Sequence, residues 1–165
     1  MNSNPRMPAI CAAHGAPILL EDEIWLGELA AWARALPRPK TGLMISAHWE
    51  QRPAALGATR PVPLVYDFYG FPERYYRTRY PCPGAPELAE RVRGLLGGQG
   101  IAFADEPERG LDHGAYVPLV AMYPEADYTY CGEAVRLRDA EHCRITNSRF
   151  LEVGGNAIYV EGGNL

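Results

Sequence analysis

The chain is organised around GLMISAHWE, residues 42–50, an apolar run that ends in a histidine followed by an aromatic residue and an acid. An unbroken apolar run is typical of a strand that is buried on both faces of a parallel sheet. Open α/β sheets bind their ligands just beyond the carboxyl ends of such strands. His48 is therefore the first candidate for chemistry.

A second apolar run, PAICAA at residues 8–13, also ends in a histidine, His14. Between the two runs, residues 21–36 carry apolar side chains at helical spacing and acids in the first turn, which predicts a helix. A strand, helix and strand joined by short connections are expected to form a right-handed unit. Such a unit brings His14 and His48 to one edge of the sheet, where two imidazoles could share one metal.

Composition narrows the classes of function. The chain has 165 residues, enough for one domain with its own core, and 16 basic against 20 acidic residues give a net charge of −4. No basic cluster follows a predicted helix, so nucleic acid is not expected as a partner. No apolar segment approaches the roughly 18 residues that suggest a membrane span, and no secretory leader is recognisable. The four cysteines form no C-x-x-C pair, and a cytoplasmic protein without a membrane partner is expected.

Residues 51–84 are dense in proline and aromatic side chains, which disfavours long regular elements. We predict a long ordered loop here, with short strands at 54–58 and 76–80. Two interpretations of this loop stay open, because loops of such length in compact domains are often functional. It is either a lid packed over the sheet or a wall that shapes a substrate site.

The next elements are predicted from local signals. Residues 86–96 form a helix that begins with proline and stops at a Gly-Gly pair, residues 101–104 form a strand, and residues 116–122 form a short helix with proline in its first turn. His113 lies in the turn before this last helix. The expected fold class is α/β, with a mainly parallel sheet flanked by helices.

The pattern changes near residue 127, where short apolar alternations separated by polar turns begin. Residues 143–158 resemble one turn of a right-handed parallel β-helix of the polysaccharide-lyase type. The chain is therefore expected to consist of an α/β domain at 1–127 and a β-helix-like tail at 128–165. The tail has fewer turns than the roughly three that a stacked core needs. His142 lies in this tail and matches no motif.

Five stretches in chain order carry a more specific resemblance: HGAP at 14–17, SAHWE at 46–50, YDFYGFP at 66–72, YPCPG at 80–84 and RGLDHG at 109–114. Through these stretches, residues 8 to about 126 resemble the first half of the class III extradiol ring-cleavage dioxygenases, within the DOPA 4,5-dioxygenase branch. The resemblance implies that the expected α/β fold is that of this superfamily, in incomplete form.

The resemblance also assigns roles to three histidines. It implies that His14 and His48 are metal ligands and that His113 is a catalytic residue near the substrate. The implied cofactor is Fe(II), with Zn(II) able to occupy the same site, and the implied partners are a small catecholic substrate and O₂. No residue is assigned to substrate binding.

The chemistry suits these residue types on independent grounds. A non-heme Fe(II) oxygenase uses neutral imidazoles and one further ligand on one face of the metal and leaves positions open for substrate and O₂. A histidine that is not a ligand can move protons near neutral pH. Asp112 either orients His113 or caps the following helix. Glu50 and Asp67 either face the cleft or, in the favoured interpretation, lie on the solvated surface.

The third metal ligand of the resembled enzymes comes from their second half, which this sequence does not match. Two hypotheses follow. In the first, the chain is an Fe(II)-dependent extradiol dioxygenase of catechols such as DOPA, and the tail or a neighbouring subunit of a homo-oligomer supplies the ligand. In the second, the chain is a truncated or chimeric, non-catalytic protein with residual metal binding and a β-helix fragment of the carbohydrate-binding type.

Overall fold

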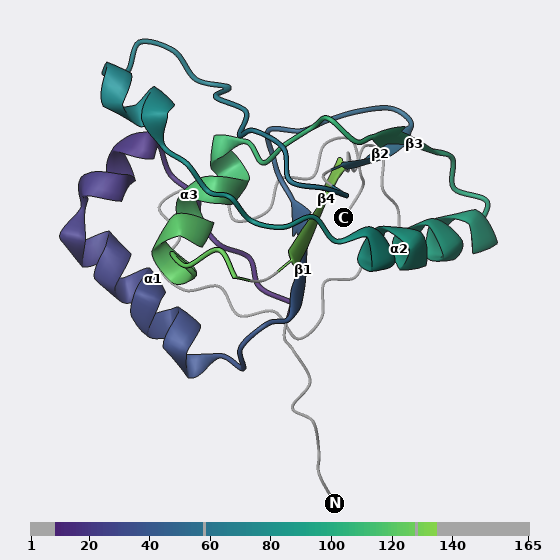
Figure 1. The fold of residues 1–165 in the computed structure, drawn as a ribbon, viewed down its shortest axis with the longest axis horizontal. Helices are drawn as coiled ribbons and strands as arrows, with labels where there is room; N and C mark the ends of the chain where they lie inside the picture. Colours follow the sequence, from purple (N-terminus) through teal and green to yellow (C-terminus); the bar gives the residue numbers. More distant parts are fainter. Residues whose placement is uncertain (1–8, 58, 128, 135–165) are drawn as a thin grey trace, which may run out of the picture.

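The computed structural model of the protein describes residues 9–57, 59–127 and 129–134. The described part contains one four-stranded sheet, whose strands are β1 (Thr41–Ile45), β2 (Ala54–Gly57), β3 (Phe103–Glu106) and β4 (Thr129–Ala134). The helices are α1 (Glu23–Ala35), α2 (Pro86–Gly98) and α3 (His113–Met122), with short 3₁₀ helices η1 (Pro17–Glu21) and η2 (Glu73–Arg77). Figure 1 shows α1 and α3 side by side and α2 on the other side of the strands. The expected α/β class is confirmed.

The sheet is mixed rather than purely parallel. Its strand order is β1-β4-β2-β3, with β1 parallel to β4, β2 parallel to β3, and β2 antiparallel to β4. Residues 129–134, which the sequence assigns to the tail, form β4, and β4 lies between β1 and β2. The rest of the predicted β-helix-like tail, residues 135–165, lies outside the described residues, and the division at 127 stays a prediction.

Two predicted strands do not form. Residues 9–16 contain no strand, and residues 73–77 form η2 instead of leading into a strand at 76–80. A strand needs a ladder partner, and in the described part of the chain β1 pairs with β4 rather than with the segment before His14. The apolar run before His14 and the alternating aromatic residues at 76–80 were therefore insufficient to predict a strand.

The predicted helices are confirmed with small shifts at their ends. In α1 the carboxylate of Asp22 accepts hydrogen bonds of 3.0 Å from the backbone N–H groups of Ile24 and Trp25, which caps the first turn. The third helix begins at His113 rather than at Tyr116, because Asp112 caps it. No helix among the described residues is long and apolar enough to cross a membrane.

The main core lies around α3, whose residues Tyr116 and Val117 are fully buried. It packs against α1 and against aromatic residues of the loop at 51–84, while α2 covers Leu56 of β2 in a second, smaller core. The prediction that β1 is buried on both faces is wrong. Leu43 and Ile45 are 40% and 60% exposed. The core around α1 and α3 lies on the face that carries Met44, whereas α2 packs on the opposite face over Leu56 of β2 rather than over β1.

Candidate metal and active site

His48 lies in a tight turn at the carboxyl end of β1. The backbone N–H of Trp49 donates to the carbonyl oxygen of Ser46 at 3.3 Å, which closes the turn, and the N–H of His48 donates to the Ser46 hydroxyl at 3.1 Å. The strand therefore delivers His48 to the sheet edge in a defined backbone conformation, as the sequence analysis expected.

His14 reaches the same place by a different route from the one predicted. No strand lies between residue 9 and His14; instead η1 begins three residues after His14 and packs against α1 and α3. Pro17, the first residue of η1, is fully buried and anchors this segment. The side chain of His14 consequently comes within hydrogen-bond distance of His48, with 2.9 Å between their Nε2 atoms.

His113 is the first residue of α3 and is 8% exposed. The chain before it runs beside residues 63–65, where the N–H of Val65 donates to the carbonyl oxygen of Leu111 at 2.8 Å. This approach needs glycine at position 110, because a Cβ there would lie 1.9 Å from the carbonyl oxygen of Pro63. The pairing of the two segments places the residues just after Val65 next to His113.

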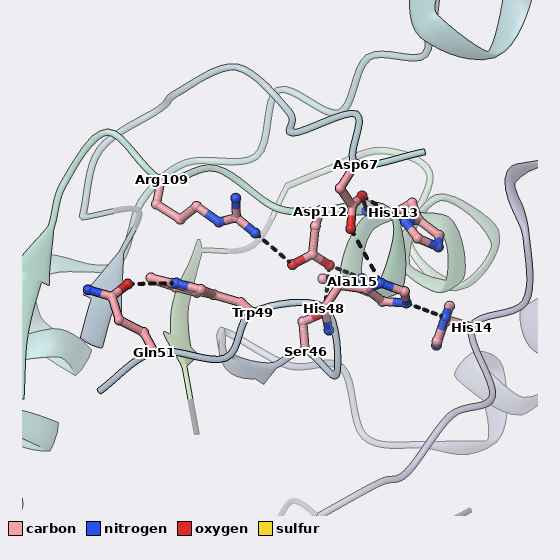
Figure 2. A network of polar contacts seen from close by, with 10 residues as sticks. All are labelled: His14, Ser46, His48, Trp49, Gln51, Asp67, Arg109, Asp112, His113 and Ala115. Carbon is pink, nitrogen blue, oxygen red and sulfur yellow. Dashed lines mark hydrogen bonds and ion pairs between the residues drawn. The ribbon is translucent and has the colours of Figure 1, made fainter. Parts of the chain in front are cut away.

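The three imidazoles converge on one point, as Figure 2 shows. Ring centroids are separated by 4.8 Å between His14 and His48, 4.1 Å between His48 and His113, and 5.4 Å between His14 and His113. One ring nitrogen from each histidine lies within 4.8 Å of those of the other two. Three segments that are far apart in the sequence thus contribute one side chain each to a single cluster.

Asp67 joins two of these rings. Its Oδ1 lies 2.7 Å from Nδ1 of His113 and accepts the backbone N–H of the same residue at 3.2 Å, while its Oδ2 lies 3.4 Å from Nδ1 of His48. The side chain of Asp67 is only 20% exposed. The interpretation of Asp67 as solvated surface is therefore wrong, because pairing of residues 65 and 112 turns it into the site.

A second carboxylate, that of Asp112, ties the His48 turn to the start of α3. It accepts the Ser46 hydroxyl at 2.5 Å and the backbone N–H of Ala115 at 3.3 Å, and the guanidinium of Arg109 lies 3.3 Å away. Asp112 is 2% exposed. Its observed contacts make it the cap of α3, while the carboxylate that contacts the His113 ring is Asp67.

The surroundings of the cluster favour the neutral form of the His14 imidazole. Burial lowers the pKa of His14, and the positive charges that His48 and His113 can carry lower it further. Burial alone would raise the pKa of Asp67, but hydrogen bonds from the His113 ring and backbone outweigh this effect and hold the pKa below its ordinary value. The site therefore combines an imidazole whose neutral form is favoured with a carboxylate whose charged form is favoured.

This donor set fits a transition-metal ion. Two nitrogens that bind one ion at about 2.1 Å and at a right angle lie about 3.0 Å apart, close to the 2.9 Å between Nε2 of His14 and Nε2 of His48. Imidazole suits iron and zinc alike, so the donors do not select between the two metals. The site residues His14 and His48 therefore fit a shared ion.

Aromatic side chains form one side of the site. The ring of Phe68 lies edge-on to His113 with 5.8 Å between centroids and packs against Tyr66, Phe71 and Tyr76 at 6.1, 5.4 and 4.8 Å. The loop predicted at 51–84 is therefore ordered and packed. Its use as a wall for substrate stays a prediction.

The sequence pointed to all three clustered histidines. For Asp67 the solvated surface was favoured over the cleft, since nothing in the spacing of an acid within an aromatic loop indicates a site. Glu50, its companion in that interpretation, is exposed. His142 lies outside the described residues. The structure brings His14, His48 and His113 together, whereas their roles as ligands or catalytic groups stay predictions.

Comparisons with known proteins agree with this geometry. Residues 8–144 match the family described as the catalytic LigB subunit of aromatic ring-opening dioxygenase. A 4,5-DOPA dioxygenase extradiol of Beta vulgaris is 41% identical over 129 residues, which cover 75% of this chain and 48% of that protein. The protein of the same name from Escherichia coli K12 is 40% identical over 126 residues, 76% of this chain and 46% of its own length.

A solved structure, described as an uncharacterized protein of Escherichia coli K12, is also similar. It matches with a TM-score of 0.62 and 34% identity, and the match covers 79% of this chain and 48% of that one. The chain thus spans about half the length of the relatives it matches. With the family match extending over most of its residues, the chain belongs to the LigB family of aromatic ring-opening dioxygenases.

Proposed function

We propose that this chain acts as a metal-dependent extradiol dioxygenase that opens the ring of a small catechol with O₂. The observation that carries the proposal is the convergence of three imidazoles from distant segments at one sheet edge, in a member of the LigB family. Relatives named as 4,5-DOPA dioxygenases point to DOPA or a similar catechol as the substrate.

His14 and His48 would hold the metal, which we propose to be Fe(II), with Zn(II) able to occupy the same position. The lowered pKa of His14 supports this role, because only a neutral imidazole can bind a metal. When bound by these residues, a ferrous ion would supply open coordination positions for the catechol and for O₂.

His113 would hold and move a proton beside the substrate. Its Nδ1 is engaged by Asp67, so the nitrogen left for the substrate is Nε2. Phe68 places an aromatic side chain beside His113, 5.8 Å away between ring centroids, and an aromatic lining of this kind supports a flat aromatic ring as the guest. Burial of His113 keeps bulk water away from this proton.

The test is reconstitution of the metal-free protein with Fe(II) under anaerobic conditions, followed by addition of a catechol and air. We expect a yellow ring-opened product, about one bound iron per chain, and loss of both in His48→Ala. Arg91→Ala, an exposed change on α2, serves as the control and should retain both. Retained iron without any product from a panel of catechols would instead support metal binding without turnover.

A further inference from the structure

We propose that Asp67 is a positioning residue that fixes the ring tautomer of His48 and His113 at once, so that both rings turn an unprotonated Nε2 toward the centre of the site. This inference deepens the proposed function and rests on it for the identity of the ligand. The observation behind it is that one carboxylate faces Nδ1 of both rings, at 3.4 Å for His48 and 2.7 Å for His113.

A neutral imidazole carries one proton, and the group that faces each nitrogen decides where this proton lies. An ionised carboxylate only accepts hydrogen bonds, so a ring nitrogen that faces it is favoured in the N–H form. Asp67 therefore draws the proton of each ring to Nδ1. The opposite nitrogen, Nε2, is left with its lone pair exposed.

The free lone pairs point where a metal is needed. Nε2 of His48 already lies 2.9 Å from Nε2 of His14, and the nitrogens of all three rings gather within 4.8 Å. Figure 2 shows Asp67 on the far side of His48 from His14. Carboxylates placed behind metal-binding histidines orient the ring and raise its basicity, and loss of such a partner commonly weakens metal binding by about 10- to 100-fold.

The two oxygens of Asp67 have different partners, so a substitution of Asp67 should affect the two rings differently. Oδ1 accepts the backbone N–H of His113 and lies 2.7 Å from its ring Nδ1, whereas Oδ2 lies 3.4 Å from Nδ1 of His48. In Asp67→Asn, the single amide oxygen is expected to stay with His113, because the backbone N–H there can only donate. The amide N–H₂ group then faces Nδ1 of His48.

Two donors cannot face each other, so His48 must move its proton from Nδ1 to Nε2 in this variant. His113 should keep its original tautomer. The substitution is nearly isosteric, and its effect is therefore confined to one ring. A role limited to filling space or to general electrostatics would treat the two rings alike.

The experiment is long-range ¹H–¹⁵N NMR of imidazole nitrogens in the metal-free full-length protein at pH 9, above the range in which imidazole ordinarily titrates. Single His→Asn variants assign the signals. In the unmodified protein we expect the Nδ1–H tautomer for both His48 and His113. Finding Nε2–H in either ring would overturn the inference without any variant.

In Asp67→Asn we expect His48 to switch to Nε2–H while His113 does not. The matched control is Asp105→Asn, which removes an acid of β3 that pairs with Arg93 on the surface and should change neither ring. Binding of Zn(II), followed by competition with a chromophoric chelator, should weaken about 10- to 100-fold in Asp67→Asn and not in Asp105→Asn.

Different results would refute the proposed function and the positioning role of Asp67. If the unmodified protein binds neither Fe(II) nor Zn(II), the proposed function fails, while the tautomers in the metal-free protein still decide the role of Asp67. If the protein binds metal and opens catechols but Asp67→Asn leaves His48 in the Nδ1–H form, the positioning role of Asp67 is refuted alone.

Discussion

Gly114, the second residue of α3, offers a test of how tightly the site is packed. A Cβ at this position would lie 2.7 Å from Cδ2 of His48, 2.8 Å from the Ser46 hydroxyl and 3.2 Å from Oδ1 of Asp112. Carbon atoms in good contact are about 3.5–4.0 Å apart, so the His48 ring would have to shift by close to 1 Å. The Ser46 hydroxyl cannot easily rotate away, because it donates to Asp112 at 2.5 Å.

The expected magnitude for Gly114→Ala follows from two opposed terms. Alanine in place of glycine stabilises a helix by up to about 1 kcal/mol. Forcing a methyl group into a packed site costs about 1–3 kcal/mol. The net change in the free energy of unfolding is therefore a loss of up to about 3 kcal/mol, accompanied by displacement of His48 and weaker metal binding.

Gly94 of α2 provides the matched control, because a Cβ there meets nothing within 4 Å. Gly94→Ala should stabilise the protein by up to about 1 kcal/mol, since only the helix term acts. Urea unfolding of both variants, with Zn(II) affinity measured in parallel, separates the two terms. The reasoning is refuted if Gly114→Ala is as stable as Gly94→Ala and binds Zn(II) with the affinity of the unmodified protein.

Two further predictions concern stability and reactivity. Asp112→Ala should lower the free energy of unfolding by about 2–4 kcal/mol, because it leaves buried donors without an acceptor. Removal of the exposed cap in Asp22→Ala should lower it by only about 1 kcal/mol. Equal losses of the two variants in chemical denaturation would contradict this difference. Burial raises the pKa of the Cys82 thiol to about 12, so at pH 9 iodoacetamide should modify exposed Cys11 well before Cys82, as peptide mass spectrometry can show. Neutral Cys82 also contributes to the free energy of unfolding. This contribution is fully present below the pKa of the unfolded thiol, near 9, and is lost as the pH rises from there toward 12.

Helices were predicted well because their signals are local. The caps, the apolar spacing and the proline at the first position of α2 all lie within the helix or beside it. Strands were predicted less well, because a strand exists only with its ladder partner. β1 and β4 pair although they are far apart in the sequence, and no pattern near residue 129 indicated that pairing.

The residues of the candidate site also fall into those that short motifs indicate and those that only tertiary pairing brings to the site. Resemblance to a known family identified His14, His48 and His113 from short motifs, since the chemistry constrains those residue types. Asp67 carried no such signal by itself. Its role depends on the pairing of Val65 with Asp112, which is a property of the folded backbone.

The sequence by itself therefore determined the helices, the α/β class and the identity of three histidines, because these follow from local physical preferences and from motif chemistry. Only the tertiary structure decided that the sheet is mixed, that the face of β1 carrying Leu43 and Ile45 is exposed, and that one carboxylate stands behind two imidazoles. The physical reason is that strand pairing and the convergence of side chains bring together residues that are far apart in the sequence. No periodic pattern in the sequence indicates which distant residues will meet.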